Sequence, residues 1–160
     1  MSHESTISAG EPGTRFRIRR GRRTDFMAVM HLLAAGGEPV PVPDRATLRR
    51  FRHLVADLGA DFYLVSVDGR LAGLVHLTYA RQLAGAPRAQ LDQLVVAQSF
   101  RRRGIGSALL AFAQGRAQRR GCATLSCTME TRGASHFLER AGLRATGTSF
   151  EQDLQAGARE

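Results

Sequence analysis

The sequence lacks lysine, tryptophan and any long hydrophobic run. All 23 of its basic residues are arginine, and its 160 residues include only two cysteines. A phosphate-binding P-loop is excluded, because that motif requires a lysine. No apolar run approaches the roughly 18 residues that cross a membrane, and the first residues, MSHESTISAGEPGT, lack the basic and apolar regions of a secretory signal. We therefore expect a cytoplasmic protein with no membrane partner.

The cysteines and histidines do not form a recognisable metal or redox motif. Cys122 and Cys127 have neither the CxxC spacing of a redox pair nor a zinc-ligand spacing. No set of His, Cys, Asp and Glu has the spacing of a metal site, and the Gly-x-Ser-x-Gly elbow of hydrolases is absent. We therefore expect reduced cysteines and no bound metal.

The formal net charge is +9, which favours anionic ligands such as nucleic acid or a phosphorylated cofactor. The densest basic run near the N-terminus is RFRIRRGRR, residues 15–23. No helix-turn-helix, zinc-finger or RNA-binding signature accompanies it. We assign these arginines to the solvated face of an edge strand, and do not expect a nucleic-acid partner. A basic nucleic-acid-binding module is the least favoured interpretation.

Hydrophobic periodicity predicts one α/β domain over residues 15–155, between a disordered tail at 1–14 and a short tail at 156–160. The predicted element order is β α α β β β α β α β: an antiparallel N-terminal meander that leads into a β-α-β unit. The predicted helices cover 24–35, 44–59, 104–121 and 132–142. The predicted strands cover 15–20, two runs on either side of Asp68-Gly69, 89–97, 122–130 and 143–154.

Turn and cap residues set several of these boundaries. Asp68-Gly69 suits a type I′ hairpin turn. Asp44 is the predicted N-cap of the helix at 44–59, Leu58 belongs to its apolar stripe, and Gly59 ends it. Gly142 is expected to close the last helix.

The segment QSFRRRGIGSALLAF, residues 98–112, places three arginines and two glycines where a strand meets a helix. A helix N-terminus carries unpaired N–H groups and a positive dipole end. Gly104 and Gly106 let the backbone approach a ligand closely, and consecutive N–H groups form an anion-binding nest. The residues therefore predict a phosphate or pyrophosphate site. Leu109 replaces the third glycine of a dinucleotide-binding fingerprint, so that motif fits poorly.

Within LDQLVVAQSFRRRGIGSALL, Arg101, Gly104 and Gly106 fill the pattern [Arg/Gln]-x-x-Gly-x-[Gly/Ala]. This segment resembles the acetyl-CoA-binding segment of the GCN5-related N-acetyltransferase (GNAT) superfamily. ASHFLERAGL resembles the later Ala-x-x-Phe-Tyr-x-x-x-Gly-Phe segment of that family. The resemblance covers roughly residues 15–155. It implies a GNAT-like mixed sheet and an acyltransferase that moves an acetyl group from acetyl-CoA directly to a primary amine of a small molecule or protein.

The resemblance also implies a set of acetyl-CoA-binding residues. Backbone groups of Leu94, Val95 and Val96 would face the pantetheine arm, and one N–H, of Val95 or Val96, would polarise the thioester carbonyl. Thr131 stands where the family often has asparagine, and its hydroxyl could bond the cofactor. The pyrophosphate would lie on the turn formed by Arg101, Arg102, Arg103, Gly104, Ile105, Gly106 and Ser107.

Asp92 is the candidate general base. An acceptor amine with a pKa of about 10.4 is mostly protonated at neutral pH, so a group must take its proton. Asp92 lies two residues before Leu94 and is expected on the same strand face. The alternatives are that it pairs with a charged substrate or with an arginine. His76 alternates with apolar residues in its strand and is a second residue that could face the cleft.

The family's tyrosine, the usual acid for the leaving thiolate, falls on Leu138, which cannot donate a proton. Four other residues could protonate the thiolate in its place: His136, Ser135, Tyr79 and Cys127. Leu138 also keeps open an alternative: a catalytically impaired GNAT-fold protein that binds CoA or acts as a regulatory partner. Strands at 122–129 and 143–154 could pair across a homodimer.

Overall fold

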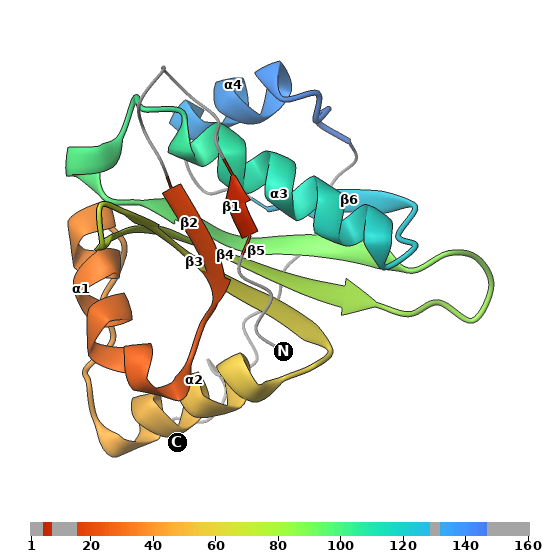
Figure 1. The fold of residues 1–160 in the computed structure, drawn as a ribbon. Helices are drawn as coiled ribbons and strands as arrows, with labels where there is room; N and C mark the ends of the chain where they lie inside the picture. The colour runs from red at the N-terminus through yellow and green to blue at the C-terminus, as the bar shows by residue number, and fades with distance from the viewer. Residues whose placement is uncertain (1–4, 8–15, 129–131, 147–160) are drawn as a thin grey trace, which may run out of the picture. The chain divides into compact units, whose positions relative to one another are not determined.

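The computed structural model describes residues 5–7, 16–128 and 132–146. The chain divides into two compact units, residues 1–128 and 129–160. The first unit holds the sheet and three of the four described helices, and the second holds one helix (Figure 1).

The first unit is built on a six-stranded sheet in the order β1-β2-β3-β4-β5-β6. Its first four strand pairs are antiparallel, and β5 pairs with β6 in parallel. This is the predicted meander followed by a β-α-β unit, with β1 added inside the segment expected to be a tail. The strands are β1 (Ser5–Ile7), β2 (Phe16–Arg20), β3 (Ala60–Val67), β4 (Arg70–Ala80), β5 (Arg88–Val96) and β6 (Thr124–Cys127).

Helices α1 (Phe26–Gly36) and α2 (Arg45–Ala56) cover one face of this sheet, and α3 (Ile105–Arg119) covers the other (Figure 1). Two glycines allow this close packing. A Cβ at Gly36 of α1 would lie 2.4 Å from Val95 of β5, and a Cβ at Gly73 of β4 would lie 3.2 Å from Leu109 of α3. Single 3-10 turns precede α1 (η1, Arg23–Asp25) and follow β5 (η2, Gln98–Phe100).

The second helix begins where the sequence predicts and ends earlier. The Asp44 side chain accepts a hydrogen bond from the Thr47 N–H (2.7 Å), as an N-cap does. The helix ends at Ala56, because Asp57 adopts extended backbone and its carboxylate accepts the Gly59 N–H (2.7 Å). Gly59 is therefore not the helix C-cap. Leu58 lies outside the helix and is 82% exposed, so its predicted place in the apolar stripe is wrong.

The predicted hairpin turn is confirmed. Asp68 and Gly69 both have positive φ, 48° and 76°, as a type I′ turn requires. This turn joins β3 to β4 and fixes their register. The two strands form the centre of the sheet, and most of their side chains are buried.

The second unit contains α4 (Arg132–Arg140). The helix ends at Arg140, and Gly142 follows in the turn with φ 88°, where its N–H donates to the carbonyl of Glu139 (3.0 Å). Gly142 thus closes the helix as predicted, although the helix itself is two residues shorter than the predicted range. Residues 143–146 are not a strand, and the rest of the strand expected at 143–154 lies outside the described residues, as does Thr131. None of the described helices is long and apolar enough to cross a membrane.

Candidate functional site

The C-terminal half of β5 has one open edge. β5 pairs with β4 along its whole length but with β6 only from Arg88 to Leu91. In the described part of the chain, residues 92–96 therefore have a ladder partner on one side alone. The backbone groups on the other side can hydrogen-bond a ligand, because unpaired N–H and C=O groups at a sheet edge accept a further extended chain.

The pattern of the β4–β5 ladder shows which N–H groups face this open edge. Ala97, the residue after β5, donates its N–H to the carbonyl of Ala72 in β4 (2.9 Å). In an antiparallel ladder such bonded pairs alternate with pairs whose N–H and C=O groups point outward. Val95 therefore bonds toward β4, as Ala97 does, whereas Leu94 and Val96 direct their N–H groups toward the open edge.

The loop after β5 exposes an uncapped helix N-terminus. Arg102 and Gly104 have positive φ, 60° and 78°, and Gly104 is the N-cap of α3 without a side-chain hydrogen bond to the helix. No acidic residue lies in the first turn. The first N–H groups of the helix and its positive dipole end therefore stay available for an anion.

The arginines of this loop divide into two kinds. The Arg101 guanidinium donates to the carbonyls of Gly36 (2.6 Å) and Val96 (3.2 Å), so it ties the end of α1 to the end of β5. Arg102 and Arg103 are exposed. The Arg103 guanidinium lies 5.4 Å from the centroid of the buried Phe100 ring. Arg101 thus positions the loop, while Arg102 and Arg103 are free to meet a phosphate group.

The remaining predicted residues of the loop complete the helix start. Ile105 is 1% exposed and anchors the first turn in the core, whereas Ser107 is exposed at the surface. Gly106 lies between them and is half-buried. The donors, the positive charge and the lack of carboxylates in this turn suit a pyrophosphate group, which fits acetyl-CoA.

A β-bulge places Asp92 at the site. His76 of β4 pairs with Gln93 of β5, but Leu77 pairs with Leu91, so Asp92 is an extra residue without a partner in the ladder. A bulge re-aims a side chain and bends the strand locally. The bulge could not be predicted from the sequence, because the residues at 89–97 are compatible with a regular strand.

The Asp92 carboxylate is held by two side chains of β4. Thr78 Oγ1 donates to Asp92 Oδ2 (2.7 Å), and His76 Nδ1 lies 3.8 Å from the same oxygen. The Asp92 side chain is 33% exposed, so solvent and a substrate can reach it. Thr78 was not among the residues that sequence reasoning selected, since a lone threonine in a strand carries no motif.

The bulge also changes the face that Asp92 occupies. Asp92 bonds Thr78, whereas Leu94 pairs with Val75. Thr78 and Val75 are three residues apart in β4 and point to opposite sheet faces. The expectation that Asp92 shares the face of Leu94 is therefore wrong. Asp92 lies on the face covered by α1 and α2, and Leu94 lies on the α3 face.

His76 is half-buried beside Asp92. Burial lowers the pKa of the imidazole from its ordinary 6.5, and the carboxylates of Asp92 and Asp57 partly offset that effect. Its ring packs on Phe62 (centroids 5.8 Å apart), which in turn packs on Phe51 of α2 (5.9 Å). The histidine is thereby fixed in place and favours the neutral form, which can accept a proton.

The residues that could replace the missing tyrosine as an acid lie in different surroundings. The Tyr79 hydroxyl donates to the Asp61 carboxylate (2.6 Å), and burial and that carboxylate raise the pKa of Tyr79. Burial, followed by the charge of Asp92, raises the pKa of the Cys127 thiol. Ser135 and His136 are in the second unit. Within the described ranges, no group of three or more His, Cys, Asp and Glu could hold a metal ion.

The search of solved structures finds many proteins with this fold. No curated protein matches the chain in sequence. The structure is similar to a transcriptional regulator from Bacillus halodurans (24% identity, TM-score 0.76, covering 86% of this chain and 98% of that one). It is also similar to a glucosamine-6-phosphate N-acetyltransferase from Arabidopsis thaliana (15% identity, TM-score 0.75, covering 87% of this chain and 98% of that one). A third similar structure is an aminoglycoside N-acetyltransferase in complex with CoA (18% identity, TM-score 0.71, covering 91% of this chain and 98% of that one).

A family model covers most of the domain. The model of the acetyltransferase (GNAT) family matches residues 27–143. The match begins in α1, contains the open edge of β5 and the N-terminus of α3, and ends just after α4. The chain therefore belongs to the acetyltransferase (GNAT) family.

Proposed function

We propose that this protein transfers the acetyl group of acetyl-CoA to a primary amine of a small molecule or a protein. The observation that carries the proposal is that the open edge of β5 runs directly into the uncapped, carboxylate-free N-terminus of α3. The open edge of β5 suits an extended acyl-pantetheine arm, and the N-terminus of α3 suits a pyrophosphate. A structural neighbour in complex with CoA and another named as an N-acetyltransferase support this reading.

The pyrophosphate would lie on the first turn of α3. The N–H groups from Gly104 to Ser107 would donate to its oxygens, and Arg102 and Arg103 would add positive charge. Each charge-assisted hydrogen bond could contribute about 1.5–3 kcal/mol before solvent screening. Arg101 would act indirectly, because its guanidinium already bonds backbone carbonyls of α1 and β5.

Val96 is the best candidate to polarise the thioester. Its N–H points to the open edge, as does that of Leu94, whereas Val95 bonds toward β4. An N–H donor fixed at the thioester carbonyl oxygen would stabilise the negative charge that develops there. The Arg101 bond to the Val96 carbonyl holds this part of the edge in place.

Asp92 would receive the proton of the acceptor amine on the α1 and α2 side of the bulge. The amine nitrogen bonds the acetyl carbon, the carbon–sulfur bond breaks, and the thiolate takes up a proton from solvent or from a nearby acid. His76, 3.8 Å from the Asp92 carboxylate, would relay the proton onward. Acetyl-CoA supplies the activated thioester, and no covalent enzyme intermediate is required.

The test is CoA release over a panel of primary amines by the wild type and Asp92→Asn. Loss of a general base lowers kcat about 10²–10⁴-fold at neutral pH. The difference in kcat between the variant and the wild type should narrow as pH rises, because the amine then loses its proton without a base. Asp68→Asn, the same chemical change in the exposed turn, is the control. Full turnover by Asp92→Asn would remove Asp92 from the mechanism. Binding of acetyl-CoA without turnover of any amine would favour a CoA-binding regulatory protein.

A further inference from the structure

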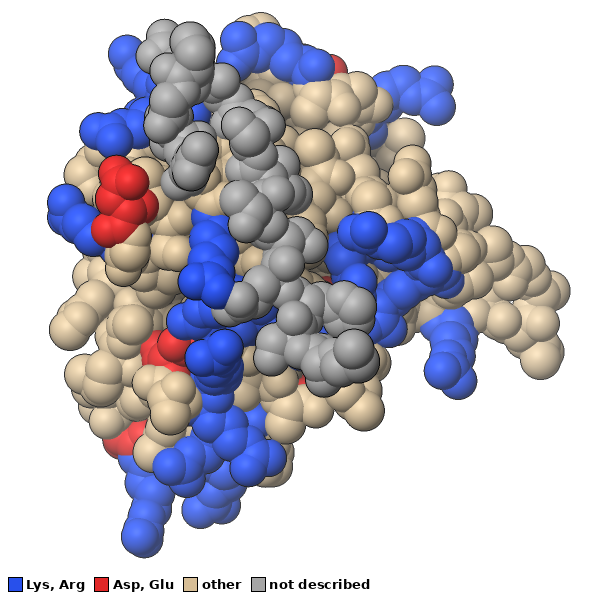
Figure 2. Space-filling view, in the orientation of Figure 1, with Lys and Arg blue, Asp and Glu red and all other residues tan. Residues whose placement is uncertain are grey.

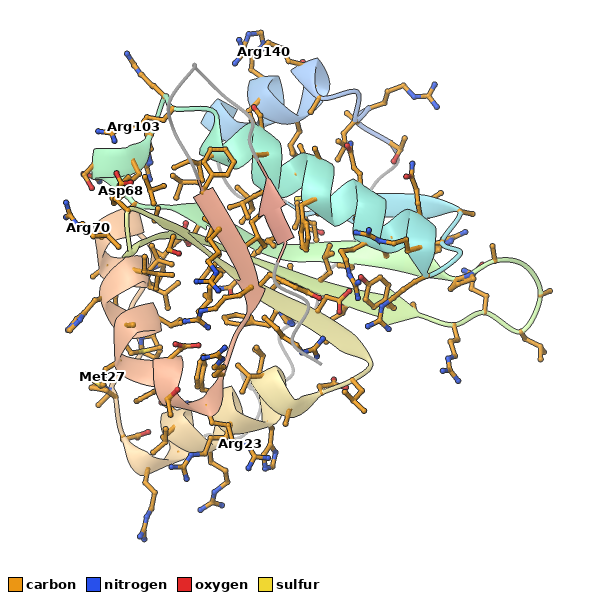
Figure 3. The ribbon with its side chains drawn as sticks, in the orientation of Figure 1. Arg23, Met27, Asp68, Arg70, Arg103 and Arg140 are labelled. Carbon is orange, nitrogen blue, oxygen red and sulfur yellow. The ribbon has the colours of Figure 1, made fainter. Side chains whose placement is uncertain are left out.

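The outer face of α2 forms a positively charged hollow away from the acetyl-transfer site. Four arginines from α2 and η1 line a hollow of about 540 Å³, and blue side chains gather over this region in Figure 2. Figure 3 shows Arg23 beside α2. We call this hollow the α2 arginine surface. It is lined by Arg23, Arg45, Leu48, Arg49, Arg52 and His53.

Helix periodicity explains how the surface arises. Arg45, Arg49 and Arg52 are spaced i, i+4 and i+7, which places them on one side of the helix. The opposite side buries Phe51 and Val55 against the sheet. All four arginines of the surface are exposed. The surface therefore lies on the side of α2 that faces away from the sheet, and Asp92, Thr78 and His76 belong to the sheet.

The charge of this surface has no acidic partner in the part of the chain that the structure describes. Among the described residues, no acidic side chain forms an ion pair with the four arginines, and none lines the hollow. Elsewhere in the same unit arginine is matched to acid: Arg19 pairs with Asp25 (2.8 Å) and Arg116 with Asp61 (2.9 Å). Like charges held close together repel one another, so the surface is suited to a partner that supplies several negative charges.

The form of the hollow favours a polyanion over a small ligand. Pockets for small molecules are lined mainly by apolar and aromatic side chains, whereas this hollow has one leucine among four arginines and a histidine. From Arg45 to Arg52 the helix rises about 10.5 Å. That length matches roughly three phosphates along one strand of a duplex, at about 3.4 Å each.

From the arginine spacing and the lack of an acidic partner among the described residues, we infer that the α2 arginine surface binds nucleic acid through its phosphate backbone. The contact is independent of base sequence, because arginine side chains that reach phosphates read no base edges. This inference differs from the prediction made from the sequence, which considered the net charge of +9 and the basic run at 15–23. Of the four arginines, three are separated from that run by more than 20 residues and are brought beside Arg23 by the fold.

The test measures fluorescence anisotropy of a labelled duplex, a single-stranded DNA and an RNA of the same sequence, without acetyl-CoA. Four phosphate contacts predict a slope of log K against log salt of about −3.6 for the duplex and about −2.8 for the single strands. Arg45→Gln/Arg49→Gln/Arg52→Gln should reduce the size of the slope by about 2–3 and weaken binding about 100-fold at about 0.1 M salt. The three probes show which nucleic acid is preferred.

The control is Arg81→Gln/Arg88→Gln/Arg119→Gln, which removes the same charge from the β4–β5 hairpin and the end of α3. It should change the slope little. Equal losses in both triple variants would mean that only net charge matters and would overturn the inference. So would the absence of wild-type binding below about 0.15 M salt, or tighter binding of polyglutamate than of nucleic acid.

Folding of each variant is checked by circular dichroism. If the triple variant does not fold, Arg49→Gln alone is tested, because Arg49 is at an exposed helix position. It should reduce the size of the slope of log K against log salt by about 0.7–0.9. Because the assay contains no acetyl-CoA and no amine, failure of the proposed acetyl transfer leaves its outcome unchanged.

Discussion

The two ends of α3 use arginine in opposite ways. At the C-terminal end, Arg116 and Arg120 converge on the buried carboxylate of Asp61. At the N-terminal end, Arg102 and Arg103 are exposed, and no acidic residue lies in the first helical turn. The arginines that meet the Asp61 carboxylate are structural, whereas the exposed charges of Arg102 and Arg103 stay available to a ligand.

The C-terminal end is a closed network. The Asp61 side chain is 0% exposed and bonds Arg116 (2.9 Å), Arg120 (3.0 Å), Arg20 (3.3 Å) and the Tyr79 hydroxyl (2.6 Å). Burial alone would raise the pKa of Asp61, but these hydrogen bonds lower it to about 2. The network joins β2, β3, β4 and α3 around one charge.

The largest effect expected from this comparison is on stability. Asp61→Asn leaves three arginines around a neutral amide, and removing one partner of a buried ionic network costs about 3–5 kcal/mol. Urea unfolding should show that loss, while acetyl-CoA affinity of the folded variant stays unchanged. Asp68→Asn, in the exposed turn, is the control. A loss below about 1 kcal/mol would show that Asp61 does not hold the network together.

The pH dependence of stability follows from the same group. The folded pKa of Asp61, about 2, lies below its ordinary 3.8, so its ionised form stabilises the fold above pH 3.8 and the contribution is lost as pH falls toward 2. The shift corresponds to about 2 kcal/mol. Acid unfolding of the wild type should show this loss. Asp61→Asn should lack it, and an identical acid profile in the two proteins would contradict the assignment.

At the other end of α3, smaller changes in binding are expected. Arg102→Gln/Arg103→Gln should weaken acetyl-CoA about tenfold or more and leave stability nearly unchanged, because exposed charge-assisted bonds are screened. Arg119→Gln, an exposed arginine at the C-terminal end, is the control and should bind like the wild type. Isothermal titration calorimetry measures both. Equal affinities for the double variant and the control would show that Arg102 and Arg103 do not contact the cofactor.

The smallest effect concerns His76. Loss of the Asp92 charge in Asp92→Asn should lower the pKa of His76 further, because that carboxylate is the largest influence that raises it. Asp57→Asn should act in the same direction with a smaller change. A proton NMR titration of the imidazole follows both. An unchanged pKa of His76 in Asp92→Asn would show that the two side chains are not neighbours in solution.

Much of the fold could be predicted from the sequence, because its signals are local. Apolar periodicity predicts the helices, Asp44 predicts the start of one of them, and Asp68-Gly69 predicts the hairpin turn. The anion-binding turn could also be predicted, because glycines between a strand and a helix let the backbone approach a ligand and arginines there add positive charge. The end of α2 could not be predicted, because it depends on the extended backbone of Asp57 and on the hydrogen bond from the Gly59 N–H to the Asp57 carboxylate.

The parts of the site that could not be predicted depend on pairing between strands. The bulge at Asp92 arises from the register of β4 against β5 and leaves no trace in the alternation of apolar residues. The contact of Thr78 with Asp92 and the direction of the Val96 N–H follow from that register. The α2 arginine surface joins helix residues to Arg23, and only the fold brings them together.

The central claim is that the start of α3 binds the pyrophosphate of acetyl-CoA. Calorimetric titration of acetyl-CoA into the wild type, Gly104→Ala and Gly104→Asp tests it most directly. Alanine at φ 78° adds roughly 1–2 kcal/mol of backbone strain, and aspartate adds a negative charge against the phosphates. The account predicts wild-type binding, weaker binding by Gly104→Ala, and at least about a 100-fold loss in Gly104→Asp. Equal affinity of Gly104→Asp and the wild type, or no binding by either, would contradict it.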